Sequence, residues 1–133
     1  MKKAPLFFLA VDDEDDRMLF TEALNEIDPD IKCIMARNGK EALILLQNEL
    51  FEVPDYIFLD LNMPIMNGLK CLAEIKDIDF LKNIPVVIYS TSSEKEFIEQ
   101  SKNLGAINFF IKPSDFNSLS RYLKEMIEGR SRP

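Results

Sequence analysis

The sequence contains no histidine and no tryptophan, and its 133 residues include only two cysteines and four glycines. Without histidine the chain cannot build a Cys/His zinc site or a Cys–His nucleophile, and any phosphohistidine donor must be another protein. Cys33 and Cys71 form no CxxC pair, so we interpret both as small buried hydrophobic residues. Neither GxGxxG nor GxxxxGK[ST] occurs, which disfavours a phosphate-binding glycine loop.

Basic residues are outnumbered as well. Lys and Arg total 16 against 23 Asp and Glu, which gives a formal net charge of −7. This balance disfavours direct binding to nucleic acid or to anionic membranes, because both are bound through basic side chains. No run approaches the ~20 apolar residues of a membrane span, and the N-terminal apolar run is too short for a secretory signal. We therefore expect a cytoplasmic protein.

The chain does have a regular alternation of apolar runs and helical patterns. Its length and its 47% hydrophobic content predict one domain. Strand and helix patterns that alternate from end to end predict an α/β sandwich with right-handed crossovers. The expected strands are 6–11, 31–36, 55–60, 86–90 and 107–111, and the expected helices are 15–27, 40–50, 68–76, 94–104 and 115–128. We expect Ser93 and Glu96 to cap the fourth helix, Gly105 to end it, and residues 129–133 to fray.

Four of the apolar runs stop at residues that can do chemistry, namely Asp12-Asp13, Asp60, Ser90 and Lys112. The carboxyl ends of parallel strands share one edge of a sheet, so these side chains are expected to meet there. Three crowded carboxylates repel one another, and a hard cation such as Mg²⁺ relieves that repulsion. Asp60, at the centre of the edge, is then the best nucleophile toward phosphorus, with Lys112 neutralising charge and Ser90 donating a hydroxyl.

The acidic residues that follow Asp13 have a simpler interpretation. Glu14, Asp15 and Asp16 are expected to be an ordinary acidic start to a helix, which the helix macrodipole favours.

Together these segments resemble the receiver domains of two-component response regulators, from about Leu6 to Ile127. The resemblance implies a flavodoxin-like three-layer sandwich, with a five-stranded parallel sheet in the order 2-1-3-4-5 and five helices. It also implies a single receiver domain over residues 1–133 with its core at 6–127. The motifs that carry it are Val11-Asp12-Asp13, Leu59-Asp60-Leu61-Asn62-Met63-Pro64 with Asn67-Gly68, Ile84-Pro85-Val86-Val87 running to Ser90, and Gly105-Ala106 leading to Lys112-Pro113.

The same resemblance implies roles for individual residues. Asp60 becomes the phosphoacceptor, Asp13 a direct Mg²⁺ ligand and Asp12 a second acidic member that often acts through water. Asp60 and the Asn62 backbone carbonyl become further Mg²⁺ ligands. The implied catalytic and switch residues are Lys112, Ser90 and Phe109, and the residues implied to tune dephosphorylation are Asn62, Ser92 and Thr91. The resemblance also implies a cis peptide between Lys112 and Pro113.

The implied function is a switch driven by phosphorylation. A sensor histidine kinase or a histidine phosphotransfer protein would phosphorylate Asp60. The face built from the fourth helix, fifth strand and fifth helix would then change its affinity for a downstream protein. Because the chain ends soon after its last expected helix, we expect output by protein contact or phosphorelay, without turnover of an external substrate.

Two alternatives compete with this interpretation. A degenerate receiver would bind partners without phosphorylation, which the acidic pair, Asp60 and Lys112 disfavour. A phosphatase of the haloacid-dehalogenase type would also use a strand-end Asp, but on the first strand and in a DxD pattern. The segment Asp60-Leu61-Asn62 lacks the second Asp.

Overall fold

The computed structural model describes residues 4–48 and 52–130. Its sheet is fully parallel, with the strand order β2-β1-β3-β4-β5, as predicted. The strands are β1 (Leu6–Ala10), β2 (Lys32–Ala36), β3 (Tyr56–Asp60), β4 (Val86–Ser90) and β5 (Asn108–Ile111).

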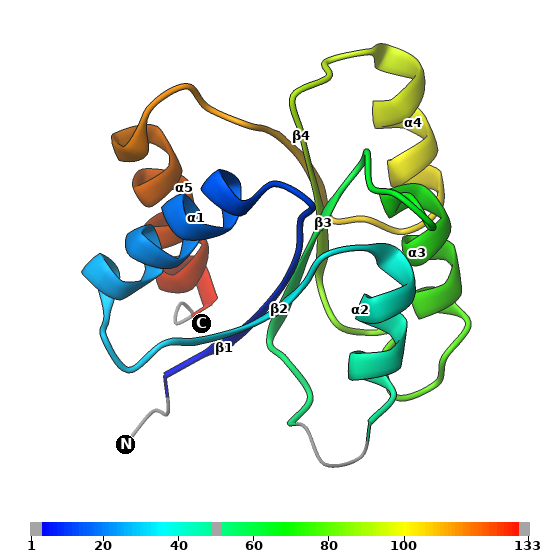
Figure 1. The fold of residues 1–133 in the computed structure, drawn as a ribbon, viewed down its shortest axis with the longest axis horizontal. Helices are drawn as coiled ribbons and strands as arrows, with labels where there is room; N and C mark the ends of the chain where they lie inside the picture. The colour runs from blue at the N-terminus through cyan, green and yellow to red at the C-terminus, as the bar shows by residue number, and fades with distance from the viewer. Residues whose placement is uncertain (1–3, 49–51, 131–133) are drawn as a thin grey trace.

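Helices cover both faces of this sheet. In Figure 1, α1 and α5 lie on one face and α2, α3 and α4 on the other. None of the helices in the described part of the chain combines the length and the apolar character needed to cross a bilayer. The helices are α1 (Glu14–Ile27), α2 (Gly39–Leu46), α3 (Gly68–Lys76), α4 (Lys95–Asn103) and α5 (Phe116–Arg130).

The period of two along each strand sorts its side chains between two hydrophobic layers. On β1, Phe7 and Leu9 join the layer under α1 and α5, whereas Phe8 and Ala10 join the layer under α2 and α3. Every residue of β3 and β4 is buried, as expected of central strands covered on both faces. The last residues of β3 and β4 are therefore shielded from water.

Aromatic rings fill much of the layer under α1 and α5. The ring of Phe20 packs edge-on against Phe58 and Tyr89, with centroid distances of 5.0 and 5.9 Å. Tyr89 also stacks on Phe110, which stacks on Tyr122 at 3.7 Å. This column of rings runs from the carboxyl end of β4 to α5.

The ends of the helices differ from the sequence expectations in three places. The predicted capping box of Ser93 and Glu96 is wrong, because α4 begins after Glu94 without a side-chain cap. The serine hydroxyls act earlier in the loop, where Ser92 Oγ accepts the Glu94 N–H at 3.2 Å. Helix α2 ends at Leu46, and residues 49 and 50 of its expected range 40–50 lie outside the described residues. Helix α5 runs to Arg130, one residue beyond the expected start of the frayed tail, and residues 131–133 are outside the description.

Gly105 ends α4 as predicted. Its φ of +100° is one that side chains rarely adopt. The N–H groups of Gly105 and Ala106 donate to the carbonyls of Lys102 and Ser101, both at 3.0 Å, which is a Schellman motif. The motif turns the chain directly into β5 and so helps to set where β5 ends.

Gly68 is required for a different reason, a close approach of two backbone segments. A Cβ at this position would overlap the backbone carbonyl oxygen of Asp60. The Gly68 N–H also donates to the Leu61 carbonyl at 3.0 Å. The start of α3 is therefore packed directly against the end of β3.

We predict that Gly68→Ala destabilises the protein by about 1–3 kcal/mol, the usual cost of overpacking, because the backbone at Asp60 must shift. Gly129→Ala is the matched control, since a Cβ there meets nothing within 4 Å and alanine is the better helix former. Urea unfolding measures both variants. A Gly68→Ala variant as stable as the wild type would contradict the close packing.

The prediction that both cysteines are buried is confirmed for Cys71 and not for Cys33. Cys71 is fully buried and donates its Sγ–H to the Gly39 carbonyl at 3.7 Å, and Cys33 is half-buried. Burial raises the pKa of both thiols to about 12. Both are therefore poor nucleophiles in the folded protein.

We predict that neither thiol reacts quickly with a disulfide reagent at pH 8, because about one thiol in ten thousand is ionised four pH units below its pKa. Both should react at once in concentrated urea, which serves as the control. Rapid labelling of the native protein would contradict this account of the thiols.

Candidate functional site

The site is organised around the ammonium group of Lys112, which follows β5. Its Nζ donates to Asp60 Oδ2 at 2.8 Å and to Asp16 Oδ2 at 2.7 Å. It also lies over the ring of Tyr89, 5.1 Å from the centroid. The side chain is 10% exposed. The Lys112 N–H donates to the Ser90 carbonyl at 2.7 Å, so the pairing of β4 and β5 aims the side chain toward β3.

Asp60 is the last residue of β3, and its side chain is as buried as that of Lys112. Its Oδ1 accepts the Asn62 N–H at 3.2 Å, and its Oδ2 accepts from Lys112. Burial raises the pKa of Asp60 above its ordinary value, although the ammonium of Lys112 and the Asn62 N–H act in the opposite direction. The negative charge on Asp60 is therefore held against a desolvation cost.

Lys112 responds differently to the same environment. Burial disfavours its charge, but hydrogen bonds and the charges of Asp16 and Asp60 outweigh burial and raise its pKa. Two carboxylates share one ammonium, so the cation is well stabilised while each anion is only partly neutralised. The pocket thus keeps a surplus of negative charge beside a fully charged lysine.

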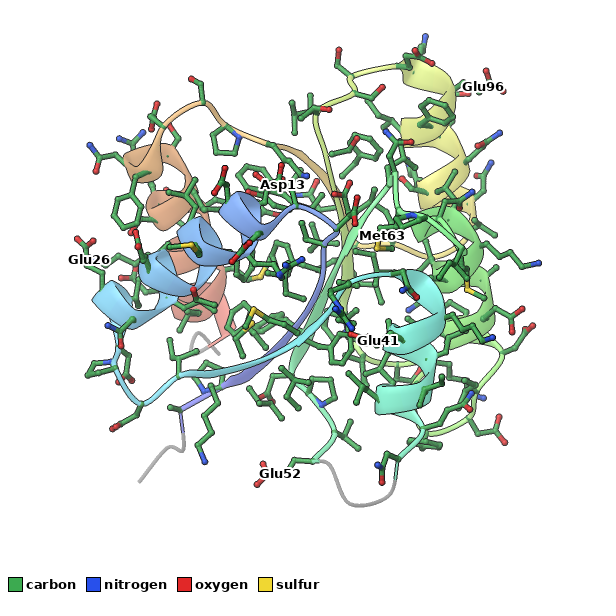
Figure 2. All side chains as sticks on the ribbon, in the orientation of Figure 1. Asp13, Glu26, Glu41, Glu52, Met63 and Glu96 are labelled. Atoms are coloured by element: carbon green, nitrogen blue, oxygen red, sulfur yellow. The ribbon has the colours of Figure 1, made fainter. Side chains whose placement is uncertain are left out.

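The predicted acidic pair lies at the start of α1, where Figure 2 labels Asp13. Asp13 is the N-cap of this helix, and its Oδ1 accepts the N–H groups of Asp15 and Asp16 at 2.7 and 3.2 Å. Arg17 fixes the preceding loop, because its Nη1 donates to the Val11 and Asp12 carbonyls at 2.7 and 3.0 Å. Asp12 and Asp13 are both exposed.

The sequence predicts that Asp12, Asp13 and Asp60 crowd together around a cation. In the described part of the chain, no group of three or more His, Cys, Asp or Glu side chains lies close enough together to hold a metal ion. The donors available are nonetheless the hard oxygens that Mg²⁺ prefers. A carboxylate whose ionised form is disfavoured by burial, such as Asp60, is also stabilised by a nearby cation. The chemistry of the donor set therefore fits Mg²⁺.

The loop after β4 holds the predicted hydroxyl residues. Ser90 is completely buried, and its Oγ accepts the Ser92 N–H at 3.0 Å. Ser92 is half-buried and Thr91 is exposed. Phe109 on β5 is half-buried and packs against the hydrophobic layer under α2, α3 and α4.

The loop after β3 contains a tight turn. Ile65 has a φ of +70°, and the Met66 N–H donates to the Pro64 carbonyl at 2.7 Å. Such a φ is unusual for a β-branched residue and indicates backbone strain. The Met66 carbonyl in turn accepts the Gly39 N–H at 3.2 Å, which ties this loop to the start of α2.

The expected cis peptide between Lys112 and Pro113 is wrong, because the described chain has no cis peptide bond. Proline lowers the preference for the trans form to about 0.5–1 kcal/mol but does not reverse it. The lysine reaches both carboxylates from a trans backbone.

Asp16 is a residue of this pocket that the sequence did not indicate, because it was expected to belong to an ordinary acidic helix start. The structure places this carboxylate against Lys112. The alternation of strands and helices could not have found it, because the direction of the Asp16 side chain depends on how α1 is rotated against the sheet.

Residues 8–124 match the family model of the response regulator receiver domain. The chain belongs to this family. It is a receiver domain of two-component signalling, and its sheet order is the one that the resemblance implied.

Individual relatives agree with this assignment. Sporulation initiation phosphotransferase F of Bacillus subtilis is 34% identical over 124 residues, covering 92% of this chain and 94% of that protein. Response regulator Rcp1 of Synechocystis is 32% identical over 93% of this chain and 84% of its own length. A protein-glutamate methylesterase/protein-glutamine glutaminase of Methanococcoides burtonii is 36% identical over 85% of this chain, but the match spans only 32% of that longer protein.

Solved structures also resemble this receiver. The phosphorylated cyanobacterial phytochrome response regulator RcpA has a TM-score of 0.84 and 33% identity, covering 94% of this chain and 92% of its own. The Mn²⁺-bound form of Rcp1 has a TM-score of 0.82 and 31% identity, covering 92% of this chain and 91% of its own.

We predict that Asp60→Asn is more stable than the wild type at pH 7. The raised folded-state pKa of Asp60 means that this carboxyl favours folding when protonated, below its unfolded pKa of ~3.9. That contribution is lost as the pH rises through the folded-state pKa. The advantage of the variant should therefore shrink as the pH falls toward 4, which urea unfolding at several pH values would measure.

Asp79→Asn is the control, because Asp79 is 97% exposed and its removal should change stability by less than about 0.5 kcal/mol. An Asp60→Asn variant that is less stable at pH 7 would show that the bond to Lys112 outweighs burial.

Proposed function

We propose that this receiver is a phosphoacceptor switch in which Asp60 takes a phosphoryl group from a phosphohistidine of another protein. The observation that carries the proposal is the buried Asp60 carboxylate at the end of the central strand, 2.8 Å from the Lys112 ammonium. The sequence has no histidine, so the donor would be a sensor histidine kinase or a histidine phosphotransfer protein. We place this reaction in the cytoplasm.

Residues of the chain have distinct parts in the transfer. An oxygen of Asp60 attacks phosphorus, the bond from phosphorus to the donor nitrogen breaks, and the histidine leaves with that electron pair. Lys112 neutralises charge on the phosphoryl oxygens, and Ser90 donates its hydroxyl to one of them. Asp12, Asp13, Asp60 and the Asn62 carbonyl would hold Mg²⁺, which when bound supplies further positive charge to the phosphoryl group.

The output would pass through α4, β5 and α5. Ser101 is the only described residue of α4 that is fully buried, so this helix is weakly attached to the core. Phosphorylation adds roughly −1.5 to −2 charges next to Ser90, which lies before α4. Ile107 and Ile111 are 58% and 44% exposed near this face and would contact a downstream protein. Coupling of about 1–3 kcal/mol is typical of such switches.

The remaining implied roles belong to the same proposal. Asn62, Thr91 and Ser92 follow Asp60 and Ser90, and they would tune how fast the phosphoryl group is hydrolysed. Phe109 would change its rotamer as the switch moves. We propose a single receiver domain with its core at residues 6–127 and no turnover of an external substrate. The buried pair of Asp60 and Lys112 disfavours the alternative of a receiver that is never phosphorylated.

We predict that acetyl phosphate with Mg²⁺ adds one phosphoryl group to the wild type and none to Asp60→Asn, because among the described residues Asp60 is the one buried carboxylate that contacts Lys112. Intact-protein mass spectrometry measures the added group. Asp79→Asn, which changes an exposed carboxylate, should be labelled like the wild type. Equal labelling of the wild type and Asp60→Asn would refute the assignment.

A further inference from the structure

Lys112 has a second carboxylate partner that the proposed function does not use. Asp16 Oδ2 lies 2.7 Å from Lys112 Nζ, as close as the phosphoacceptor itself. We propose that Asp16 is a positioning residue that holds the Lys112 ammonium in place while Asp60 reacts. This inference rests on the proposed function of Asp60.

The partner of the Lys112 ammonium changes during the transfer. When Asp60 forms a bond to phosphorus, the attacking carboxylate loses its own negative charge and its oxygens change their geometry. An ammonium paired only with Asp60 would have no fixed partner while its contact moves from the Asp60 oxygen to the phosphoryl oxygens. Asp16 forms no bond in the reaction, so its charge and its distance to Lys112 can stay constant. An ammonium has three N–H donors, and the two used here leave one for a phosphoryl oxygen.

Asp16 also restricts the movement of the Lys112 side chain. A lysine side chain has four carbons and loses about 2 kcal/mol of rotamer entropy when it is fixed. Here the ring of Tyr89 lies against one side of the ammonium and Asp16 holds another. Fixing the cation before the donor arrives removes that cost from the transfer step.

Contacts on both sides of Asp16 fix the position of α1. Its N–H is capped by Asp13 Oδ1 at 3.2 Å, which sets the first turn of the helix. One turn later Phe20 is completely buried and packs against Phe58 and Tyr89. The carboxylate is therefore carried on a segment that is anchored at both ends.

A general preference for acid at a helix start does not explain this arrangement. Glu14 and Asp15 satisfy the macrodipole and are both exposed. Only the side chain of Asp16 turns inward, where it is 28% exposed and bound to Lys112. Asp15 is thus a matched control for Asp16, with the same charge at the adjacent position.

We predict that Asp16→Ala slows phosphorylation by acetyl phosphate and Mg²⁺ on the order of tenfold, the usual effect of losing one charged hydrogen bond. Asp15→Ala should slow it by less than about twofold, because exposed charges contribute little. Equal rates for the two variants would overturn the proposal. Thermal melting of both confirms that each is folded.

Two further measurements separate positioning from a structural role. In unphosphorylated Asp60→Ala protein without metal, which removes the other carboxylate partner of the ammonium, the NMR signals of the Lys112 side chain should become mobile when Asp16→Ala is added and stay ordered when Asp15→Ala is added. In a Lys112→Ala background, Asp16→Ala should change the slow residual rate by less than about twofold, because Asp16 acts through the lysine. An ordered lysine in the protein that carries both Asp60→Ala and Asp16→Ala, or a full additional loss of rate, would contradict the inference.

The outcomes also distinguish this inference from the proposed function. If the wild type takes no phosphoryl group on Asp60, the proposed function fails, and the NMR comparison still tests whether Asp16 fixes Lys112. If the wild type is phosphorylated and Asp16→Ala matches it, only the inference fails.

Discussion

One ammonium group connects three segments that are far apart in the sequence. Lys112 follows β5, Asp60 ends β3, and Asp16 lies in the first turn of α1. Each segment could shift slightly on its own, but a buried cation constrains all three to within hydrogen-bonding distance. The carboxyl edge of the sheet is thus held together by an ion pair as well as by hydrophobic packing.

The same interaction keeps the pocket electrostatically unbalanced. Two carboxylates stabilise the one cation between them but repel each other. The pKa of Lys112 is therefore raised, and burial still raises the pKa of Asp60. A fully neutralised pocket would fold with a lower desolvation cost, yet it would offer nothing to an incoming cation or phosphoryl group. Burial of the Asp60 charge therefore lowers stability at this edge of the sheet.

The fold and the main reactive residues could be predicted because they depend on local patterns. Buried runs that end at Asp60 and Lys112 place those residues at one edge once the strands are parallel, and the structure confirms that they meet. Asp16 was missed because its position depends on the rotation of α1 against the sheet, which no strand pattern records. The Ser93 cap was wrong because the loop after β4 uses Ser92 instead, a local competition among adjacent hydroxyls.

The aromatic column beneath Lys112 has an optical consequence. The protein has no tryptophan and only three tyrosines, so its near-ultraviolet spectrum is dominated by few chromophores. Tyr89 lies 5.1 Å below the reactive ammonium and stacks on Phe110, which stacks on Tyr122. A charge over an aromatic face shifts the energy of its electronic transitions. The absorption of Tyr89 should therefore change when Lys112 is displaced, which ultraviolet difference spectroscopy could follow without a label.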